Sequence, residues 1–282
     1  MSYVLFDIGG SKIRVAVSED LKTITDSVRF DTPVKFSDGV DKIVDEAKKL
    51  TGKNTIRGIA GGIRGVLDDE RGGIVADPGG CLSNWVDEPL AKKLKKELGV
   101  EIYLENDAAL AGMGEAMFGA GIGNDIVVYH TVSTGVGGAK IENGMVDDYS
   151  HGFEPGHQIL DIDHTILGED VDPTLENLIS GTAVERRMGM KPYDIPQDDA
   201  IWDQLAMYLA HGLRNSILYW SPDAIVLGGS MIVGDPRILL DDIVRHTNQV
   251  LGEVVEAPII LDATLGDKGG LYGAMSLLSQ KV

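Results

Sequence analysis

Positive charge, cysteine and long apolar runs are all scarce in this sequence, and each shortage excludes a class of protein. Its 25 lysines and arginines are outnumbered by 44 aspartates and glutamates, and the resulting net charge of −19 disfavours attraction to nucleic acid or anionic lipid. Cys81 is the only cysteine, so no intramolecular disulfide is expected. No run of about 18 apolar residues occurs, so a membrane-spanning helix is not expected either.

The N-terminal segment and the composition indicate a cytoplasmic globular protein. The segment "MSYVLFDIGG" lacks the basic stretch, apolar run and cleavage site of a secretory signal, so we expect a cytoplasmic location. Hydrophobic residues make up 43% of the 282 residues and charged residues 24%, values typical of a chain that buries a core. One large domain or two smaller ones fit this length, and we favour two.

Glycine, by contrast, is abundant and marks a repeated pattern. The 36 glycines gather in short groups between apolar segments rather than in a flexible linker. The stretch "IGGSKI" at 8–13 aligns with "VGGAKI" at 136–141, with hydrophobic and glycine positions kept. Apolar segments flank the glycines in both places, which predicts two β-hairpins. The recurrence predicts two α/β domains of similar design.

Periodicity predicts the elements around these hairpins. Apolar residues recur at helical spacing in the expected helices: 40–50, 90–98, 200–220, a segment from Pro236 and one from about Gly270. Ser37 or Asp38 is expected to cap the first helix, and Gly99 to end the second. Asp235 is expected to precede the Pro236 helix, since proline suits a first helical turn. Further strands are expected at 55–60, 100–107, 223–230 and 258–265.

The glycine tips suit phosphate binding. Without a side chain, successive backbone N–H groups form a concavity that contacts an anion directly. Asp7, beside the first tip, would repel phosphate unless a divalent cation lay between them, so we expect it to be a Mg²⁺ ligand. Ser133 and Thr134 add hydroxyl groups at the second tip. The alternative is that each Gly-Gly pair merely makes a tight hairpin. Neither tip matches a P-loop or a dinucleotide-binding fingerprint.

Further motifs accompany the tips: "LENDAALAGMGEAMFGAG" at 104–121, "EPGH" at 154–157, "LENLISG" at 175–181 and "IVLGGS" at 225–230. With the tips they resemble the ROK family of sugar kinases and related repressors, within the superfamily of actin, hexokinase and heat-shock ATPases. The resemblance covers nearly the whole chain. It implies an α/β fold of two actin-like (ribonuclease-H-like) domains with an interdomain cleft, roughly 1–106 with 269–282, and 107–268.

The resemblance also implies site residues for transfer of the γ-phosphate of ATP to a sugar. Asp107 matches the carboxylate that accepts the hydroxyl proton, a role that suits the C-terminal end of a strand. Its alternative role is the N-cap of the following helix. The implied sugar contacts are Gly62, Asn84, Asn106, Glu154, His157 and Glu176. The implied ATP contacts are Gly9, Gly10, Ser11, Lys12, Thr134, Gly135, Gly137, Gly228 and Gly229.

Several implied sugar contacts have other interpretations. In isolation, Glu154 and His157 read as ordinary loop residues, and Glu176 as a solvated carboxylate at a helix start. Asn84 lies directly beside Trp85, whereas the family usually places an asparagine a few residues earlier, so its register stays open. Arg64, in "AGGIRGV", is a further candidate contact.

The sequence departs from the family in its metal ligands. Many ROK proteins follow E-x-G-H with a cysteine cluster that binds a structural zinc with the histidine, but residues 157–181 contain no cysteine. Thiolates are the favoured ligands of such sites, so no structural zinc is expected, and ATP with Mg²⁺ is the expected cofactor set. Asp161, Asp163, His164, Glu169 and Asp170 could hold a cation, but an acidic solvated loop is the favoured interpretation. In place of zinc, we expect apolar side chains to pack the segment and orient His157: Ile159, Leu160, Ile162, Ile166 and Leu167.

These inferences lead to an ATP-dependent hexose kinase. Glucose is the first expectation because "EPGH" resembles glucokinase-type members; N-acetylmannosamine, fructose and other hexoses are the alternatives. A sugar-sensing regulator without catalysis is a further alternative. A repressor is disfavoured, since the sequence begins directly at the first strand and carries a charge of −19. The expected partners are sugar and ATP, with no nucleic acid or membrane, and the resemblance implies a homodimer.

Overall fold

The computed structural model describes residues 1–68, 72–76 and 78–282, and these form two compact units. Unit 1 comprises 1–117, 148–152 and 267–282, and unit 2 comprises 118–147 and 153–266. Each unit has its own hydrophobic core. Within the described residues, no helix combines the length and apolar character needed to cross a membrane. The domain limits expected from the sequence, with a boundary at 106/107, stay a prediction.

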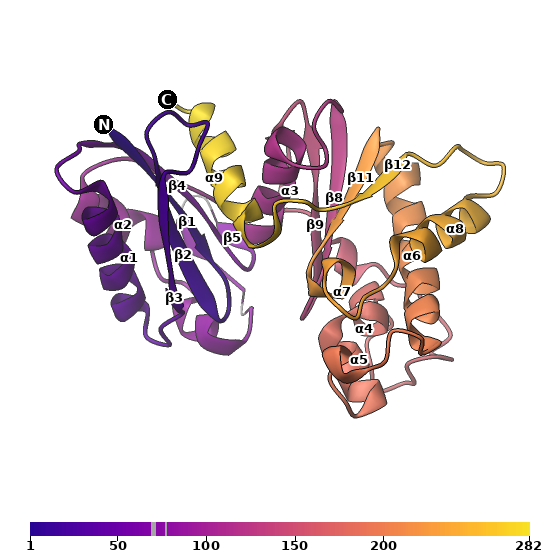
Figure 1. Cartoon of the computed structure of the whole chain (residues 1–282). Helices are drawn as coiled ribbons and strands as arrows, with labels where there is room; N and C mark the ends of the chain where they lie inside the picture. The colour runs from indigo at the N-terminus through magenta and orange to yellow at the C-terminus, as the bar shows by residue number, and fades with distance from the viewer. Residues whose placement is uncertain (69–71, 77) are drawn as a thin grey trace. The chain divides into compact units, whose positions relative to one another are not determined.

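Unit 1 is built on a five-stranded sheet in the order β3-β2-β1-β4-β7 (Figure 1). Its strands are β1 (Ser2–Ile8), β2 (Lys12–Ser18), β3 (Asp26–Asp31), β4 (Ile56–Ile63) and β7 (Ile102–Asn106). β1, β2 and β3 are antiparallel, whereas β4 and β7 run parallel to β1. The short strands β5 (Leu67–Asp68) and β6 (Gly73–Ile74) pair separately. The parallel strands therefore end at the same edge, where Asp107 follows β7.

Helices cover both faces of this sheet. They are α1 (Phe36–Thr51), α2 (Leu90–Leu98), α3 (Asp107–Phe118) and α9 (Gly269–Ser279), with the 3-10 turns η1 (Gly80–Trp85) and η4 (Gly266–Lys268). Figure 1 shows α1 and α2 on one face and α9 on the other. α3 and α9 cross closely, since a Cβ on Gly114 would lie 2.3 Å from the carbonyl oxygen of Gly269. The glycines of these two helices thus bring their backbones together.

The start of α1 differs from the sequence prediction. Neither Ser37 nor Asp38 caps it; the N-cap is Lys35, which makes no side-chain capping bond. Phe36 is buried and meets the ring of Trp85 edge-on, with 5.4 Å between centroids. Packing of Phe36 therefore sets the helix start. The end of α2 is as predicted, because Gly99 adopts the left-handed conformation at φ 75°.

Unit 2 repeats the sheet pattern in the order β10-β9-β8-β11-β12. Its strands are β8 (Ile126–Val132), β9 (Val136–Glu142), β10 (Met145–Val146), β11 (Ala224–Gly228) and β12 (Ile259–Asp262). β8 and β9 form the antiparallel hairpin, and β11 and β12 continue the sheet in parallel with β8. Each unit thus has a hairpin, a third antiparallel strand beyond it and two parallel strands on the other side, and the predicted α/β fold with a repeated design is confirmed.

The helices of unit 2 include the long buried α6. They are α4 (Leu175–Ile179), α5 (Gly181–Met188), α6 (Ile201–Trp220), α7 (Ser230–Val233) and α8 (Leu240–Leu251), with 3-10 turns η2 (Pro155–His157) and η3 (Pro192–Asp194). The predicted helix start at Pro236 is wrong, because α8 begins at Leu240. Ile238 is buried instead, and its N–H donates to the carbonyl of Met231 at 2.8 Å. That inward anchor keeps the chain extended before the helix.

Candidate active site

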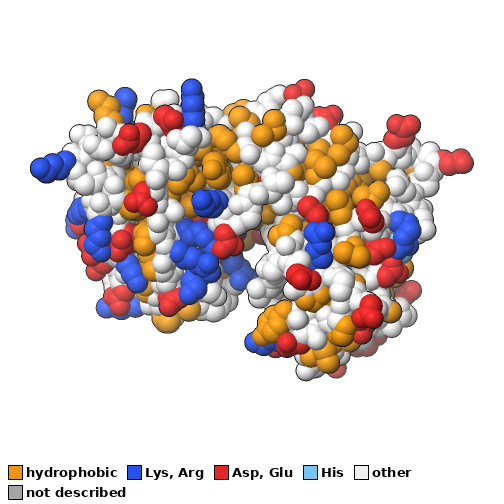
Figure 2. Space-filling model, viewed as in Figure 1, with side chains coloured by type: hydrophobic (Ala, Val, Ile, Leu, Met, Phe, Trp, Pro, Cys, Tyr) orange, Lys and Arg blue, Asp and Glu red, His pale blue; other side chains and the backbone are white. Residues whose placement is uncertain are grey.

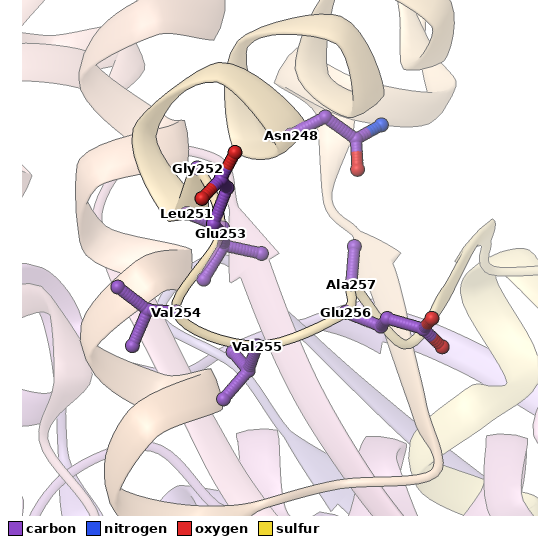
Figure 3. Close-up of a pocket in the computed structure, with 8 residues that line it drawn as sticks. All are labelled: Asn248, Leu251, Gly252, Glu253, Val254, Val255, Glu256 and Ala257. Atoms are coloured by element: carbon purple, nitrogen blue, oxygen red, sulfur yellow. The ribbon is translucent and has the colours of Figure 1, made fainter.

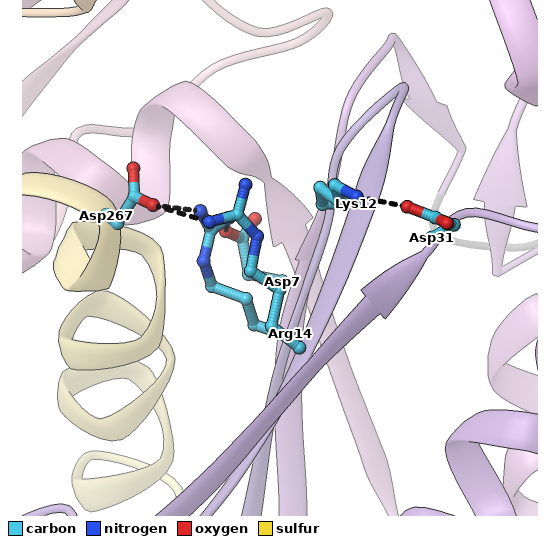
Figure 4. A network of polar contacts seen from close by, with 6 residues as sticks. Asp7, Lys12, Arg14, Asp31 and Asp267 are labelled. Carbon is cyan, nitrogen blue, oxygen red and sulfur yellow. Dashed lines mark hydrogen bonds and ion pairs between the residues drawn. The ribbon is translucent and has the colours of Figure 1, made fainter.

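The first glycine tip, residues 9–12, is a tight turn held from outside the hairpin. The N–H of Gly9 donates to the carbonyl of Lys12 at 2.9 Å. From the end of β3, the hydroxyl of Thr32 donates to the carbonyl of Gly9 at 2.7 Å, and its N–H donates to that of Ser11 at 3.0 Å. The ammonium of Lys12 pairs with the carboxylate of Asp31 (Figure 4). The tip is therefore fixed in shape before any ligand binds.

A charged network surrounds Asp7 at the end of β1. Arg14, opposite Asp7 in the hairpin register, places Nη1 3.5 Å from Asp7 Oδ2 and Nη2 2.6 Å from Asp267 Oδ2 (Figure 4). Arg29 adds a second contact to Asp267 at 3.3 Å. Figure 2 shows Lys and Arg side chains gathered on the viewed face of unit 1. A chain that is acidic overall therefore concentrates cationic groups near a predicted phosphate loop.

The carboxyl group of Asp7 has a strongly raised pKa. Burial and the negative charge of Asp107 raise its pKa from 3.8 to about 7, although Arg14 opposes this shift. A Cβ on Gly270, at the start of α9, would lie 3.0 Å from the carboxyl carbon of Asp7. The side chain is thus enclosed by β2 and α9, and it interacts with Asp107 through their charges. Such strongly shifted groups are typical of functional sites.

Asp107 begins α3 directly after β7, and its neighbour provides the helix cap. The side-chain oxygen of Asn106 accepts the N–H groups of Ala108 at 2.9 Å and Ala109 at 3.1 Å, and its amide donates to the carbonyl of Gly65 at 3.1 Å. Asn106 therefore does the capping that was the alternative role for Asp107. Asp107 Oδ1 also accepts the N–H of Ala108, at 2.9 Å.

Gly62 lies next to the backbone of both Asp7 and Asp107. It is opposite Asp7 in the pairing of β1 with β4, and a Cβ on it would lie 3.3 Å from the Cα of Asp107. Nearby, a Cβ on Gly10 would lie 3.5 Å from Nη1 of Arg64. The structure thus groups five predicted residues in unit 1: Asp7, Gly10, Gly62, Arg64 and Asp107. Asn84, by contrast, is an exposed residue of η1, and no described contact ties it to this group.

Asp7 fits a magnesium ligand that relies on other oxygen donors. A carboxylate is a ligand that this hard cation prefers, and proteins commonly bind Mg²⁺ through one or two carboxylates together with substrate phosphates. Across residues 1–68, 72–76 and 78–282, no group of three or more His, Cys, Asp or Glu side chains is arranged to hold a metal. Such a cation would therefore take most of its ligands from phosphate and water.

The second glycine tip, at 133–135 in unit 2, is held by neutral groups. The N–H of Gly181 donates to the carbonyl of Ser133 at 2.7 Å, and the hydroxyl of Thr182 donates to that of Thr134 at 2.8 Å. The hydroxyls of Ser133 and Ser230 lie 3.1 Å apart. Gly137, predicted to contact ATP, follows in β9 opposite Thr131. The N-terminus of α5 therefore braces this tip.

Glu176 connects the second tip to the predicted sugar residues. Its Oε2 accepts the N–H of Val136 at 2.7 Å. The pKa of Glu154 is raised, first by desolvation of its carboxylate although the residue is largely exposed, and further by the negative charge of Glu176; His157 opposes the shift. Glu154 therefore interacts electrostatically with both His157 and Glu176, and sugar binding by these residues stays a prediction.

The segment after His157 is not packed as predicted. Ile159, Ile162 and Ile166 are 60%, 77% and 45% exposed, so the expectation that they pack the segment is wrong. Leu160 and Leu167 do pack against the core of unit 2. A buried carboxylate organises the turn between these leucines, because it offers several acceptor sites to backbone N–H groups that isoleucine side chains cannot satisfy.

That carboxylate belongs to Asp161. Its Oδ2 accepts the N–H of Leu167 at 2.8 Å and that of Ile166 at 3.1 Å. Burial raises the pKa of Asp161, but the bonds from these N–H groups outweigh that effect and leave it lower than usual. The absence of zinc stays a prediction, and the structure identifies hydrogen bonds that hold the segment.

The glycines at the end of β11 have a packing role. A Cβ on Gly228 would lie 2.3 Å from the hydroxyl of Tyr129, and one on Gly229 would lie 2.2 Å from the carbonyl of Val132. Gly229 also has φ 87°, a conformation that favours glycine. Packing and backbone conformation therefore account for glycine at both positions. Contact of these glycines with ATP stays a prediction.

Arg14 and Asp267 were missed by the sequence reasoning. They are 253 positions apart, and a single sequence carries no signal that links them. Arg14 itself was accessible to inference, because it faces the same side of the hairpin as Asp7 under the strict period of two.

A surface cavity of about 690 Å³ in unit 2 has none of the predicted site residues in its lining (Figure 3). It is lined by the end of α8 and the following loop: Asn248, Leu251, Gly252, Glu253, Val254, Val255, Glu256 and Ala257. Its two carboxylates would repel a phosphate, so it does not suit ATP.

Comparison with known proteins identifies the family of this chain. The sequence profile of the ROK family matches residues 3–281. The chain belongs to the ROK family. The fructokinase of Lactococcus lactis subsp. cremoris is 30% identical over 241 residues, covering 82% of this chain and 79% of that protein. The glucokinase of Thermotoga maritima is 27% identical, covering 98% and 96% of the two chains.

A solved structure extends the similarity to three dimensions. A ROK family glucokinase from Streptomyces griseus, in complex with glucose and AMPPNP, matches with a TM-score of 0.80 at 28% identity. The match covers 99% of this chain and 100% of that one. The two five-stranded sheets are therefore the ROK fold, and the chain is a ROK family sugar kinase whose relatives divide between fructokinases and glucokinases.

Proposed function

We propose that this protein transfers the γ-phosphate of ATP to a hexose, with the 6-hydroxyl of glucose as the preferred acceptor. The observation that carries the proposal is the group of Asp7, Gly62 and Asp107 in unit 1, where two interacting carboxylates lie beside a glycine tip. Phosphoryl transfer asks a protein mainly for positioning, charge stabilisation and one base. A base and a cation ligand are the two functions that this pair supplies.

In the proposed reaction, Asp107 accepts the proton of the sugar hydroxyl while that oxygen attacks the γ-phosphorus. A bond forms between the hydroxyl oxygen and phosphorus, the bond to the β,γ-bridging oxygen breaks, and ADP leaves with that electron pair. Asp7 would hold Mg²⁺, and the bound cation would supply positive charge to neutralise the phosphate oxygens. Arg14 keeps positive charge beside Asp7.

Unit 2 provides the other binding groups in this proposal. The tip at 133–135, which α5 holds in place, supplies hydroxyl and backbone donors for phosphate. Glu154, His157 and Glu176 supply acceptors and a donor for the ring hydroxyls of the sugar. Glycine residues 9, 10, 135, 137, 228 and 229, with Ser11, Lys12 and Thr134, remain the proposed ATP contacts, and Gly62, Asn84 and Asn106 remain proposed sugar contacts.

Fructose is the second candidate acceptor, because the 30%-identical relative from Lactococcus lactis is a fructokinase. The glucose complex of the Streptomyces griseus protein and the "EPGH" element favour glucose. Pocket contacts that separate such sugars are worth about 1–3 kcal/mol each, so either outcome needs only small differences in the pocket. N-acetylmannosamine is a further alternative within the same reaction class.

A coupled ADP-release assay over hexoses and N-acetylhexosamines tests the proposal. We expect ADP release that depends on both Mg²⁺ and sugar, with the highest kcat/KM for glucose. A higher kcat/KM for fructose would move the assignment to the second candidate. Sugar binding without ADP release on any member of the panel would favour a sugar-sensing regulator. Light scattering would test the homodimer that we propose from the resemblance.

A further inference from the structure

The residue after His157 is tied to three parts of unit 2. The side-chain oxygen of Gln158 accepts an N–H from Asn215, on α6, at 2.6 Å. Its side-chain nitrogen donates to the carbonyl of Pro155 at 2.8 Å, and its backbone carbonyl accepts the N–H of Leu175 at 3.0 Å. Gln158 thus connects η2, α4 and α6 through a single side chain and its own backbone.

Two glycines let the segments around Gln158 pack closely together. A Cβ on Gly212, in the middle of α6, would lie 2.5 Å from Cδ2 of Leu175 and 3.1 Å from the side-chain nitrogen of Gln158. Glycine in a helix interior costs about 1 kcal/mol relative to alanine. A Cβ on Gly156 would lie 2.3 Å from the carbonyl oxygen of Val136. The "EPGH" turn therefore rests against β9 on one side and is tied to α6 on the other.

The turn needs such external restraint. η2 has only three residues, Pro155–His157, and one 3-10 turn has little stability of its own. Glu154 and His157 flank its buried Pro155 and Gly156, yet both are themselves exposed. Hydrogen bonds to neighbouring elements must therefore hold the backbone from which these two side chains project.

We propose that Gln158 and Asn215 are positioning residues that hold Glu154 and His157 in the arrangement that binds the sugar. This inference rests on the proposed function for its substrate. Gln158 locks the turn onto itself through Pro155, and Asn215 fixes Gln158 to α6. Asp161 supports the same segment from its far side, because it holds the turn that leads back to α4.

Gln158→Met tests the proposal because methionine fills a similar volume without forming either side-chain hydrogen bond. We expect hydrogen exchange of the peptide spanning 154–160 to become at least about tenfold faster, since restraint of this turn is lost. We expect the KM for glucose to rise about 5–20-fold, with kcat and the KM for ATP within about twofold of wild type. Asn215→Ala should reproduce both effects.

The double variant and a matched control separate positioning from general destabilisation. If both residues act through one contact, Gln158→Met with Asn215→Ala should be no worse than the more severe single variant. Asn124→Ala removes a similar amide-to-carbonyl bond in unit 2, to Gly121 at 3.1 Å, and should change neither readout.

Unchanged exchange at 154–160 in Gln158→Met would overturn the proposal, whatever the kinetics. So would equal increases in the KM values for glucose and ATP, because these would indicate a general structural effect. If wild type phosphorylates fructose instead, the KM for fructose replaces that for glucose. If wild type phosphorylates no hexose, the proposed function is wrong and this substrate role falls with it, while the exchange result still decides whether Gln158 restrains the turn.

Discussion

The two glycine tips share a backbone plan and differ in the side chains that lie near them. Both join antiparallel strands at the same position of equivalent sheets. The tip at 9–12 is surrounded by charge, with Asp7, Arg14 and Asp267 in one network. The tip at 133–135 is held by hydroxyl and backbone groups from α5. One hairpin design therefore supports two kinds of chemistry, and the neighbouring residues decide which.

This contrast suggests a division of labour in the proposed reaction. The charged network beside the first tip suits a cation and a proton acceptor, whereas the hydroxyl groups of the second tip suit direct contact with phosphate oxygens. Substitutions at the first tip should therefore act on catalysis and metal dependence. Those at the second tip should act on substrate affinity.

Asp107→Asn is expected to have the largest effect. Loss of a positioned base lowers kcat by about 10²–10⁴, while sugar and ATP binding stay near their wild-type values. Steady-state kinetics and calorimetric binding would measure both. Asp26→Asn, on exposed β3, is the matched control. Near-wild-type turnover in Asp107→Asn would remove Asp107 from the mechanism and leave unit 1 without its proposed proton acceptor.

Asp7→Asn should have the next largest effect, on metal dependence. A neutral amide is a poorer ligand for a hard cation, so the Mg²⁺ concentration for half-maximal activity should rise about tenfold. A Mg²⁺ titration at saturating sugar would measure this rise. An unchanged titration would show that the first tip does not bind the cation through Asp7.

The same substitution should make the folded protein more stable, although it weakens Mg²⁺-dependent activity. A carboxyl group whose pKa is raised from 3.8 to about 7 holds its proton more tightly when folded. Asp7 therefore does not destabilise the fold below pH 3.8. The destabilisation grows as the pH rises from 3.8 and is complete above about pH 7. Without Mg²⁺, Asp7→Asn should be about 1–3 kcal/mol more stable than wild type at about pH 8. Urea unfolding across this pH range tests it, and a difference that does not grow with pH would contradict it.

Glu176 should produce a smaller, separable effect at the second tip. Glu176→Ala removes the acceptor for the Val136 N–H, so the KM for ATP should rise about 3–10-fold, in line with a hydrogen bond worth about 1 kcal/mol. Glu176→Gln keeps an acceptor oxygen and should leave the KM for ATP near wild type, although both variants should raise the KM for sugar. Glu185→Ala, exposed on α5, is the control. An equal rise in the KM for ATP in both variants would rule out the bond to Val136 as the cause.

Metal removal should have the smallest effect. We expect no stoichiometric zinc, and activity after chelation should return fully when excess Mg²⁺ is restored, because no thiolate set is available near His157. Elemental analysis of the purified protein checks this directly. About one zinc per chain, with unfolding on its removal, would show that a metal and not the Gln158 contacts holds the segment.

Local patterns predicted those parts of the fold that local physics determines. The hairpins, the length of α6 and the left-handed Gly99 all follow from apolar spacing and glycine chemistry. The starts of α1 and α8 did not follow, because burial of Phe36 and Ile238 overrides the capping preferences of Ser37 and Asp235. Element boundaries depend on packing that one sequence does not display.

The site divides in the same way. Asp7, Asp107 and the glycine tips are recognisable because each motif is contiguous in the sequence. Gln158 and Asn215 are 57 positions apart, and nothing in either segment indicates their pairing. The buried role of Asp161 was also hidden, since an acidic loop reads as solvated until the backbone N–H groups around the carboxylate are known.

The most direct test of the proposed function follows the phosphorus atom itself. Wild type and Asp107→Asn would be incubated with ATP, Mg²⁺ and glucose, and the products followed by ³¹P NMR. The proposed function predicts that wild type converts the γ-phosphate resonance into that of glucose 6-phosphate, one for each ADP formed, and that Asp107→Asn does so at least about 100-fold more slowly. Appearance of inorganic phosphate in place of a sugar phosphate, or equal rates in the two proteins, would contradict it.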